Sequence, residues 1–243
     1  MFRTTLVLAM AGAAGGIAQS NQSQKGAADK ALNAMLVKTS LYVISGGGSN
    51  SVLRLSANGF ILVDGKLPGN YEAILAQAKK LSYSDQPIRA LILTDYHPDR
   101  TGNNAKFLEA GTQIIAQENV KQNLGGKVPP PTITYEHEYA LRLGGVEAEL
   151  MHFGNAYTSG DTVVYFPNLK VVAVGDLFAA APDPDFSAGG NLAGWGQVLA
   201  QILKLDFDVV VPSAGPPVTR ADLEAFKTKI DILASREALL QTK

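Results

Sequence analysis

Several residue types are absent or scarce in this chain of 243 residues, and each absence excludes a class of chemistry. There is no cysteine, which excludes disulfide bonds, thiolate metal ligands and a cysteine nucleophile. Only three histidines are present, so a metal centre built mainly from imidazole is excluded. The chain contains neither a Gly-x-Ser-x-Gly elbow nor a Gly-x-x-x-x-Gly-Lys-Ser/Thr phosphate loop. The formal net charge of −1 gives no electrostatic reason to expect nucleic acid or an anionic membrane as a partner.

The N-terminal residues have the form of a secretory signal peptide. Arg3 supplies a positive charge, Leu6–Ala18 is an apolar run of 13 residues, and small residues follow it. Because a bilayer span needs roughly 20 apolar residues, this run predicts a leader over 1–20 and no membrane span in the mature chain. We therefore expect a linker over 21–35, one domain over 36–243, and a secreted or periplasmic protein. The alternatives are an uncleaved anchor and a disordered leader.

The remaining chain has the composition and the periodicity of an α/β domain. Hydrophobic residues make up 46% and charged residues 18%, which is enough to bury a core. Apolar or alternating runs between glycine turns predict strands, helical stripes predict helices, and their interleaving indicates layered α/β packing. The predicted strands cover residues 36–45, 51–55, 60–63, 88–93, 113–116, 139–143, 146–152, 162–166, 170–174 and 209–211. The predicted helices cover residues 71–81 and 196–204 and a final segment with one apolar face at 223–233.

The most informative segment is the loop after the strand predicted at 88–93. Residues 90–103 read ALILTDYHPDRTGN. The segment resembles the metal-binding loop Thr-His-x-His-x-Asp-His-x-Gly-Gly of the metallo-beta-lactamase superfamily. Asp95 and Arg100 stand in place of its first and third histidines, while His97 and Asp99 match it.

Other segments resemble the same family in the same order along the chain. Residues 41–48 and 59–64 resemble its opening strands and their glycine turn. The loop 154–161 is similar to Gly-x-x-His-Thr-x-Gly-Asp, with Tyr157 at the histidine position, and Asp176 matches its metal-bridging aspartate. The segment 211–216 is similar to Val-Pro-Gly-His-Gly-Pro, with an alanine at the histidine position.

The resemblance covers nearly the whole chain from about residue 36 and implies a fold and a site. The implied fold is a four-layer αββα sandwich of two mixed β-sheets flanked by helices, with the site along one edge between the sheets. The implied site residues are Asp95, His97, Asp99, Arg100, Tyr157, Asp176 and Ala214.

The residues at the ligand positions argue against the family's two-metal centre. Zinc takes four ligands, mostly histidine or cysteine, and only His97, Asp99 and Asp176 match the family's ligands. We therefore expect no bound metal, with these three as residual candidates. The alternative is a single divalent ion, zinc, manganese or iron, in an oxygen-rich site that includes Asp95.

Arg100 gives a further reason to exclude the second metal. A guanidinium about 4 Å from a dication would be repelled by roughly 8 kcal/mol at an effective dielectric near 20. The same guanidinium could pair with Asp99 or Asp176 and supply the positive charge that a metal otherwise gives. We predict that Arg100 replaces the second metal; the alternative is that it points into solvent.

The other polar residues of these motifs have structural interpretations. We expect Tyr157 to be a packed aromatic residue whose hydroxyl bonds a neighbour, and Asp161 to hold its loop by hydrogen bonds. We expect His152 to be a satisfied core histidine, with a place at the pocket rim as the alternative, and Asp183 and Asp185 to be turn residues, with shaping of the pocket mouth as the alternative. His137 is expected at a solvated strand position and Lys66 in an exposed loop.

Two functions from different classes remain. The first is an exported protein of this fold that has lost hydrolysis and binds a small molecule in the edge cleft, or is a pseudoenzyme. The second is a hydrolase with one metal held by Asp95, His97 and one or both of Asp99 and Asp176. The fold alone does not decide between them, because one scaffold hosts many functions.

Overall fold

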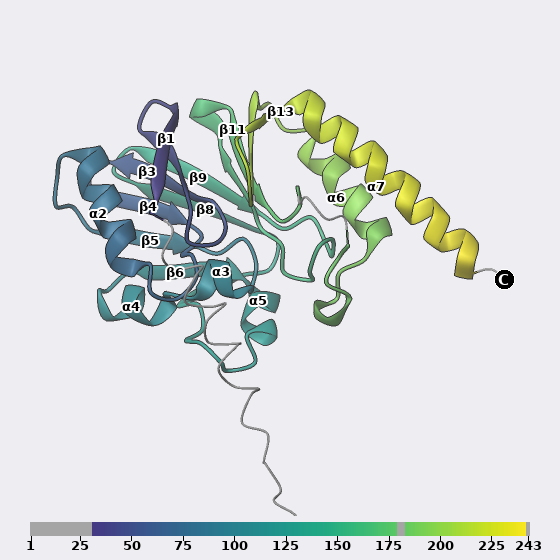
Figure 1. Ribbon diagram of the computed structural model, residues 1–243, viewed down its shortest axis with the longest axis horizontal. Coiled ribbons are helices and arrows are strands. Elements are labelled where there is room, and N and C mark those ends of the chain that lie inside the picture. The colour runs from purple at the N-terminus through teal and green to yellow at the C-terminus, as the bar shows by residue number, and fades with distance from the viewer. Residues whose placement is uncertain (1–30, 179–182, 242–243) are drawn as a thin grey trace, which may run out of the picture.

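Two mixed β-sheets lie face to face in the computed structural model, which describes residues 31–178 and 183–241. Helices cover the outer side of each sheet, as Figure 1 shows. The layers are therefore those of the αββα sandwich that the resemblance implied. The predicted signal peptide over 1–20 lies outside the described residues, as does the linker up to residue 30.

The first sheet has seven strands in the order β1-β2-β3-β4-β5-β6-β7. Pairing is antiparallel from β1 to β4 and parallel from β4 to β7. Parallel strands all end at one edge, so the loops after β4 and β5 emerge side by side. The strands are β1 (Asn33–Lys38), β2 (Leu41–Ser45), β3 (Ser51–Ser56), β4 (Gly59–Val63), β5 (Ile88–Ile92), β6 (Gln113–Gln117) and β7 (Ile133–Tyr135).

The second sheet has six strands in the order β13-β12-β11-β10-β9-β8. Its only parallel pair among these strands is β11 with β12. The strands are β8 (Glu138–Leu143), β9 (Val146–Met151), β10 (Val163–Phe166), β11 (Val171–Gly175), β12 (Val209–Pro212) and β13 (Val218–Thr219).

The helices form the two outer layers. The outer side of the first sheet packs on α2, α4 and α5 through Ile74, Phe107 and Val120. The outer side of the second sheet packs on α6 and α7 through Trp195 and Leu223. The helices are α2 (Tyr71–Ser82), α3 (Pro98–Thr101), α4 (Asn104–Glu109), α5 (Glu118–Asn123), α6 (Leu192–Ile202) and α7 (Arg220–Gln241), with short 3₁₀ turns η1 (Pro167–Leu169) and η2 (Phe186–Ala188).

The central core lies between the two sheets. Val43 and Ile61 of the first sheet and Leu150 and Val164 of the second belong to one buried cluster. Ile61 is fully buried, so its truncation to alanine would cost about 2–5 kcal/mol. The core holds the two sheets, and with them the loops at their common edge, in a fixed relation.

Two predictions near the N-terminus need correction. The strand predicted over 36–45 is a hairpin of β1 and β2, because Ser40 adopts a left-handed backbone conformation (φ 57°) that turns the chain. Residues 33–35 of the predicted linker belong to β1, and Leu32 before them is buried against the first sheet. The ordered domain therefore begins a few residues before Leu36.

Three short helices and two short strands were not predicted. The helices α3, α4 and α5 have four to six residues, and such segments are too short to show a helical period. The strands β7 and β13 are similarly short. The longer predicted elements are present, with shifts of a few residues at their ends. Within the described ranges, no helix is long and apolar enough to cross a membrane.

Candidate functional site

The loop after β5 begins the candidate site. β5 is buried, and the chain leaves it at Thr94 and Asp95, both of which are also buried. Asp95 Oδ1 accepts a hydrogen bond from the backbone N–H of His97 at 2.8 Å, which closes the turn before α3. Pro98 occupies the first turn of α3, where a missing N–H costs nothing. The side chains of Asp95, His97, Asp99 and Arg100 therefore project from one tight turn.

Gly175 brings the second sheet to the same place. It has a φ of 52°, and a Cβ atom there would lie 2.6 Å from Thr94 Oγ1. Only glycine permits this close approach without displacement of Thr94. Asp176, the next residue, therefore faces the loop after β5 although it follows a strand of the other sheet.

Arg100 is buried among four carboxylates. Its Nη2 lies 2.6 Å from Asp176 Oδ1 and its Nη1 lies 2.5 Å from Asp99 Oδ2. Its Nε lies 3.3 Å from Asp95 Oδ2 and 3.6 Å from Asp64 Oδ2. The side chain is 1% exposed, which rules out the alternative of a residue that points into solvent. The prediction of an ion pair with Asp99 or Asp176 is confirmed, and Arg100 pairs with both.

These contacts explain the charge states of the carboxylates. Burial raises the pKa of Asp64 to about 7, even though Arg100 is close. Burial also acts to raise the pKa of Asp95, but the Arg100 charge and the His97 hydrogen bonds outweigh it and lower the pKa to about 2. Asp95 is therefore the carboxylate that stays ionised deepest in the site.

His97 lies among three carboxylates. Its Nδ1 is 2.9 Å from Asp95 Oδ1 and 3.9 Å from Asp176 Oδ2, and its Nε2 is 3.4 Å from Asp185 Oδ2. Burial acts to lower the pKa of His97, but the hydrogen bond to Asp95 and the nearby negative charges raise it to about 9. In the absence of a metal, the ring is therefore positively charged at neutral pH.

Asp185 was predicted to be a turn residue, and it is one, but it also belongs to the site. It caps η2 and accepts a hydrogen bond from the Tyr96 hydroxyl. Asp64 and Tyr96 were likewise not predicted as site residues. The available signals were that Asp64 ends a buried strand beside β5 and that Tyr96 stands between two site residues.

Tyr157 and Ala214 complete the predicted set. The Tyr157 ring packs edge-on against Trp195 at 5.4 Å between centroids and lies 5.7 Å from the His97 ring, so it borders the site as a packed aromatic residue. Burial raises the pKa of Tyr157 to about 12, so its hydroxyl stays neutral. Ala214 is exposed on the loop after β12 and carries no donor atom. That loop is tied to the first sheet by Asn50 Nδ2, which donates to Gly215 O at 2.8 Å.

Three side chains could together hold a metal ion. Asp95, His97 and Asp176 each offer one ligand atom, and these atoms lie within 4.8 Å of one another. Arg100 contacts Oδ2 of Asp95 and Oδ1 of Asp176, which leaves Oδ1 and Oδ2, respectively, on the side of His97 Nδ1. Asp99 is not in this group. The donor set fits one oxygen-preferring ion and does not fit the two zinc ions implied by the family, since a guanidinium lies where the second would need its ligands.

The remaining motif residues are structural, with corrections at His137 and Lys66. Asp161 accepts hydrogen bonds from Thr158 N–H and Oγ1 at 2.8 and 2.7 Å, as predicted. His152 is partly buried with Nδ1 2.8 Å from Asp161 O. His137 is exposed as predicted, but it lies between β7 and β8 and not in a strand.

The prediction that Lys66 is exposed was wrong. Lys66 is completely buried, and its Nζ donates to Ile44 O at 2.9 Å and to Ser49 O at 2.7 Å. Burial lowers the pKa of Lys66 to about 8. Its φ of 65° turns the side chain inward, and a positive φ at a lysine gives no signal in the sequence.

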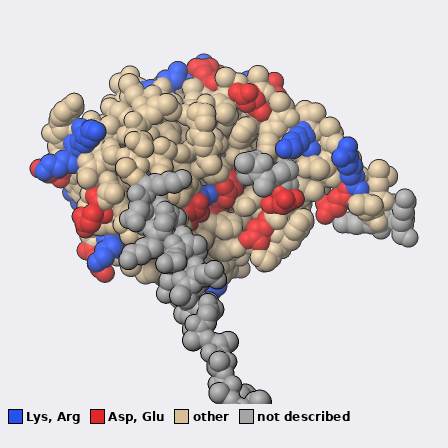
Figure 2. Space-filling view, viewed as in Figure 1, with Lys and Arg blue, Asp and Glu red and all other residues tan. Residues whose placement is uncertain are grey.

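Acidic side chains gather near the middle of the face shown in Figure 2. Within the site itself, the side chains of Asp99, Asp176 and Asp185 are 31%, 15% and 18% exposed, while Arg100 is buried beneath them. The accessible surface of the site is therefore formed by carboxylates and the His97 ring.

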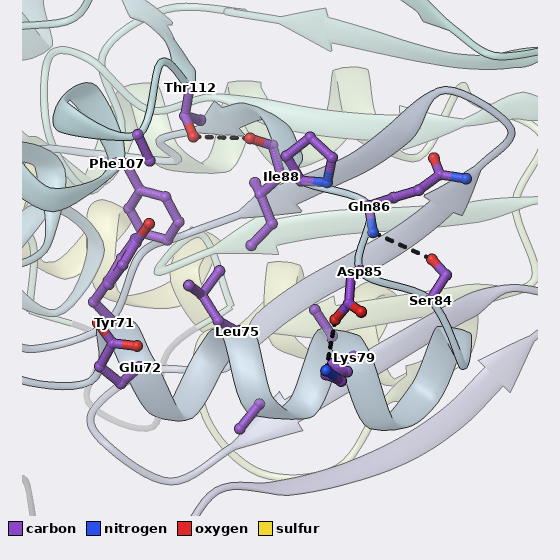
Figure 3. Close-up of a pocket in the computed structure, with 14 residues that line it drawn as sticks. Tyr71, Glu72, Leu75, Lys79, Ser84, Asp85, Gln86, Ile88, Phe107 and Thr112 are labelled. Atoms are coloured by element: carbon purple, nitrogen blue, oxygen red, sulfur yellow. Dashed lines mark hydrogen bonds and ion pairs between the residues drawn. The ribbon is translucent and has the colours of Figure 1, made fainter.

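A separate hollow of about 470 Å³ lies beside α2 (Figure 3). Tyr71, Leu75, Ile88 and Phe107 are among the residues that line it, and the Lys79–Asp85 ion pair at 2.7 Å lies at its rim. None of the predicted site residues lines it, so it is not part of the candidate site.

The sequence of the chain matches the model of the metallo-beta-lactamase superfamily over residues 44–214. It is 24% identical to the metallo-beta-lactamase type 2 of Bacillus cereus over 192 residues, which are 74% of this chain and 72% of that protein. It is 25% identical to the 2,4-dinitroanisole O-demethylase subunit alpha of Nocardioides sp. (strain JS1661) over 154 residues, or 61% of this chain. That alignment spans about half of the demethylase subunit, 47% of its length.

Solved structures share the fold. A metallo-beta-lactamase from Pontibacter korlensis superimposes with a TM-score of 0.74 at 20% identity, covering 82% of this chain and 99% of that one. The metallo-beta-lactamase FIM-1 from Pseudomonas aeruginosa, in its mono-zinc form, gives 0.73 at 17% identity, with 85% and 98% covered. At these identities the superpositions establish the architecture alone.

Proposed function

The chain belongs to the metallo-beta-lactamase superfamily, and we propose that in this member the Arg100 guanidinium takes the place of the second metal. The cleft at the sheet edge then binds a small molecule without a two-metal hydrolytic centre. The observation that carries this proposal is the burial of Arg100 among Asp64, Asp95, Asp99 and Asp176. A permanent cation in this position neutralises carboxylates that a dication would otherwise neutralise.

The chemistry of water supports the loss of hydrolysis. A metal ion lowers the pKa of bound water from about 15.7 to about 7, which makes hydroxide available at neutral pH. Arg100 is fully buried and cannot bind water in the same way. Positive charge alone therefore replaces the electrostatic role of the metal, but not its role in generating a nucleophile.

A second candidate is a hydrolase with one divalent ion. It is favoured by the approach of donor atoms from Asp95, His97 and Asp176 to within 4.8 Å of one another. One nitrogen and two carboxylate oxygens suit manganese or iron, and also zinc with a water as a further ligand. Under this candidate, Arg100 would hold the outer oxygens of two ligands and would still exclude the second metal.

Metal analysis of the protein purified without chelator separates these candidates. The proposal predicts well under one equivalent of transition metal per chain, and a folding stability that does not change when a chelator is added. One equivalent of a single metal would favour the second candidate. Two zinc ions per chain would contradict both, because Arg100 would then have to leave the site.

We also propose that the protein is exported. The support is the order of positive charge, apolar run and small residues over 1–20. Mass spectrometry of the protein recovered outside the cytoplasm should find a mature N-terminus near residue 20. An intact Met1 on that protein would argue for the uncleaved anchor instead.

A further inference from the structure

Carboxylates from different parts of the chain lie against both nitrogens of the His97 ring. Asp95, in the loop after β5, lies against Nδ1, while Asp185, in the segment before η2, lies against Nε2. The Tyr96 ring stacks at 4.5 Å between centroids on the His97 ring. The orientation of the imidazole is thus set by residues on both edges and on one face.

Asp185 is itself held in place by both of its oxygens. Oδ1 accepts from the N–H groups of Ser187 and Ala188 at 3.0 and 3.2 Å, and from Ser187 Oγ at 2.5 Å. Oδ2 accepts from the Tyr96 hydroxyl and is the oxygen that faces His97. Because Oδ1 already accepts three hydrogen bonds from the turn, the carboxylate cannot rotate without breaking them.

The backbone around Asp185 is anchored to the position of Tyr157. Asp185 N–H donates to Tyr157 O at 2.8 Å, and Gly190 N–H donates to Asp185 O at 2.9 Å. A Cβ atom on Gly190 would lie 2.1 Å from Tyr157 O, so only glycine allows the segment to lie this close. The position of Asp185 is therefore built into the fold and does not depend on a bound ligand.

We propose that Asp185 is the positioning residue of the site: its Oδ2 accepts a hydrogen bond from Nε2–H of His97, 3.4 Å away, and so directs Nδ1 toward Asp95 and Asp176. In metal sites, the second nitrogen of a histidine ligand commonly donates to a carboxylate that fixes its tautomer and orientation. Here Asp185 faces Nε2 of His97, while Asp95 and Asp176 face Nδ1. Nδ1 is then the atom at which the cleft takes a divalent cation, or shares a proton with Asp95 when no cation is bound.

This inference rests on the proposed function only in taking the same cleft as the working site. Asp185→Asn tests the inference, because the hydrogen bonds from the backbone N–H groups of the turn fix the orientation of the new amide. Its oxygen has to face the N–H groups of Ser187 and Ala188, which leaves its NH₂ group to face Nε2. A donor in that position requires Nε2 to lose its proton, so the ring becomes neutral and keeps its proton on Nδ1, beside Asp95.

The readout is the proton on each ring nitrogen, seen by ¹H–¹⁵N correlation spectra of histidine-labelled protein. His97→Gln identifies the His97 signals among the three histidines. We expect Nε2 to be protonated in the wild type and unprotonated in Asp185→Asn, with Tyr96→Phe leaving Nε2 protonated but with faster proton exchange. Asp183→Asn is the matched control, since it removes the same charge from an exposed residue of the same segment. An unchanged Nε2 signal in Asp185→Asn would overturn the inference.

A second readout uses Zn²⁺ alone, titrated into the chelator-treated protein by calorimetry. If the wild type binds Zn²⁺, Asp185→Asn should weaken binding by roughly 10- to 100-fold, and Asp183→Asn should not change it. Equal affinity of wild type and Asp185→Asn would overturn the inference. Two zinc ions per wild-type chain would contradict the replacement by Arg100 without affecting the Nε2 result, so failures of the two proposals are distinguishable.

Discussion

Arg100 and Asp176 are in direct contact, with 2.6 Å between Nη2 and Oδ1, although they follow strands of different sheets. The same guanidinium contacts Asp99 and Asp95. One buried cation therefore joins the loop after β5 to the loop after β11. This contact makes the charge balance of the site part of the stability of the fold.

Removal of that cation should destabilise the protein. Arg100→Ala removes the guanidinium that Asp95, Asp99 and Asp176 share and leaves His97, among the described residues, as the one positive group beside Asp95 and Asp176. We expect a loss of about 3–5 kcal/mol in the free energy of unfolding. Urea unfolding with a chelator present measures it. The control is Arg142→Ala, which breaks an exposed pair with Glu147 and should cost about 1 kcal/mol or less. Equal stability of the two variants would show that the buried ion pairs contribute nothing.

Zinc should distinguish two substitutions of the same residue. Arg100→His restores one imidazole of the family pattern beside Asp99 and Asp176, so zinc should raise its melting temperature. The same zinc concentration should have less effect on Arg100→Ala. The histidine variant should not form a two-metal centre, because Tyr157 and Ala214 supply no imidazole. An identical shift in both variants would argue against a ligand position at residue 100.

Hydrolysis of β-lactams should be negligible. Under the proposed function, the site has no metal ion that would convert water to hydroxide at neutral pH. Arg100 is too buried to stabilise an anionic intermediate. A chromogenic cephalosporin assay should give the same rate for active and heat-inactivated protein. Turnover clearly above that background, and abolished in Asp99→Ala, would contradict the proposed loss of hydrolysis.

Lys66 should contribute to stability although it lies outside the ion-pair group around Arg100. Lys66→Met keeps the length of the chain but removes the hydrogen bonds to Ile44 O and Ser49 O. A hydrogen bond from a charged group contributes about 1.5–3 kcal/mol, so the variant should unfold at lower urea. Lys79→Met, which removes an exposed pair with Asp85, is the control and should be nearly neutral. If the two variants unfold at the same urea concentration, burial of Lys66 has no stabilising role.

The pH dependence of stability should include a contribution from Asp161. Burial raises the pKa of Asp161 from 3.8 to about 8 in the folded state. Protonated Asp161 contributes fully to the free energy of unfolding below pH 3.8, the pKa of the group in the unfolded chain. This contribution is lost as the pH rises through about 8, its pKa in the folded state. The slope in this window is at most about 1.4 kcal/mol per pH unit.

Asp161→Asn tests this contribution. The amide oxygen can still accept from Thr158 N–H, but the side chain no longer titrates. Urea unfolding between pH 5 and 8 should therefore show a smaller decline with pH in the variant than in the wild type. Parallel curves would assign the decline to other groups.

Much of the fold could be predicted because it depends on local patterns. The buried strand before Asp95 and the stripe of Tyr71–Ser82 carry their period in the sequence, and both elements are present. The hairpin at Ser40 and the four-residue helix at Pro98 could not be predicted in the same way. A single residue with positive φ, or one turn of helix, is too short to give a period.

The candidate site, like the fold, could be predicted only in part. The sequence by itself determined which groups are available: the lack of cysteine, the few histidines, and an arginine beside two acidic residues in the loop after β5. Those facts exclude a histidine-rich centre whatever the packing, because side-chain chemistry does not depend on the fold.

Only the tertiary structure decided which groups meet. The packing of the two sheets places Asp176 beside Arg100, and the segment before η2 places Asp185 beside His97. The side chain of Lys66 points inward to buried carbonyl oxygens. The physical reason is that burial and the distances between charges are properties of packed sheets. Residues far apart in the sequence acquire a shared electrostatic role only when the core fixes both sheets face to face.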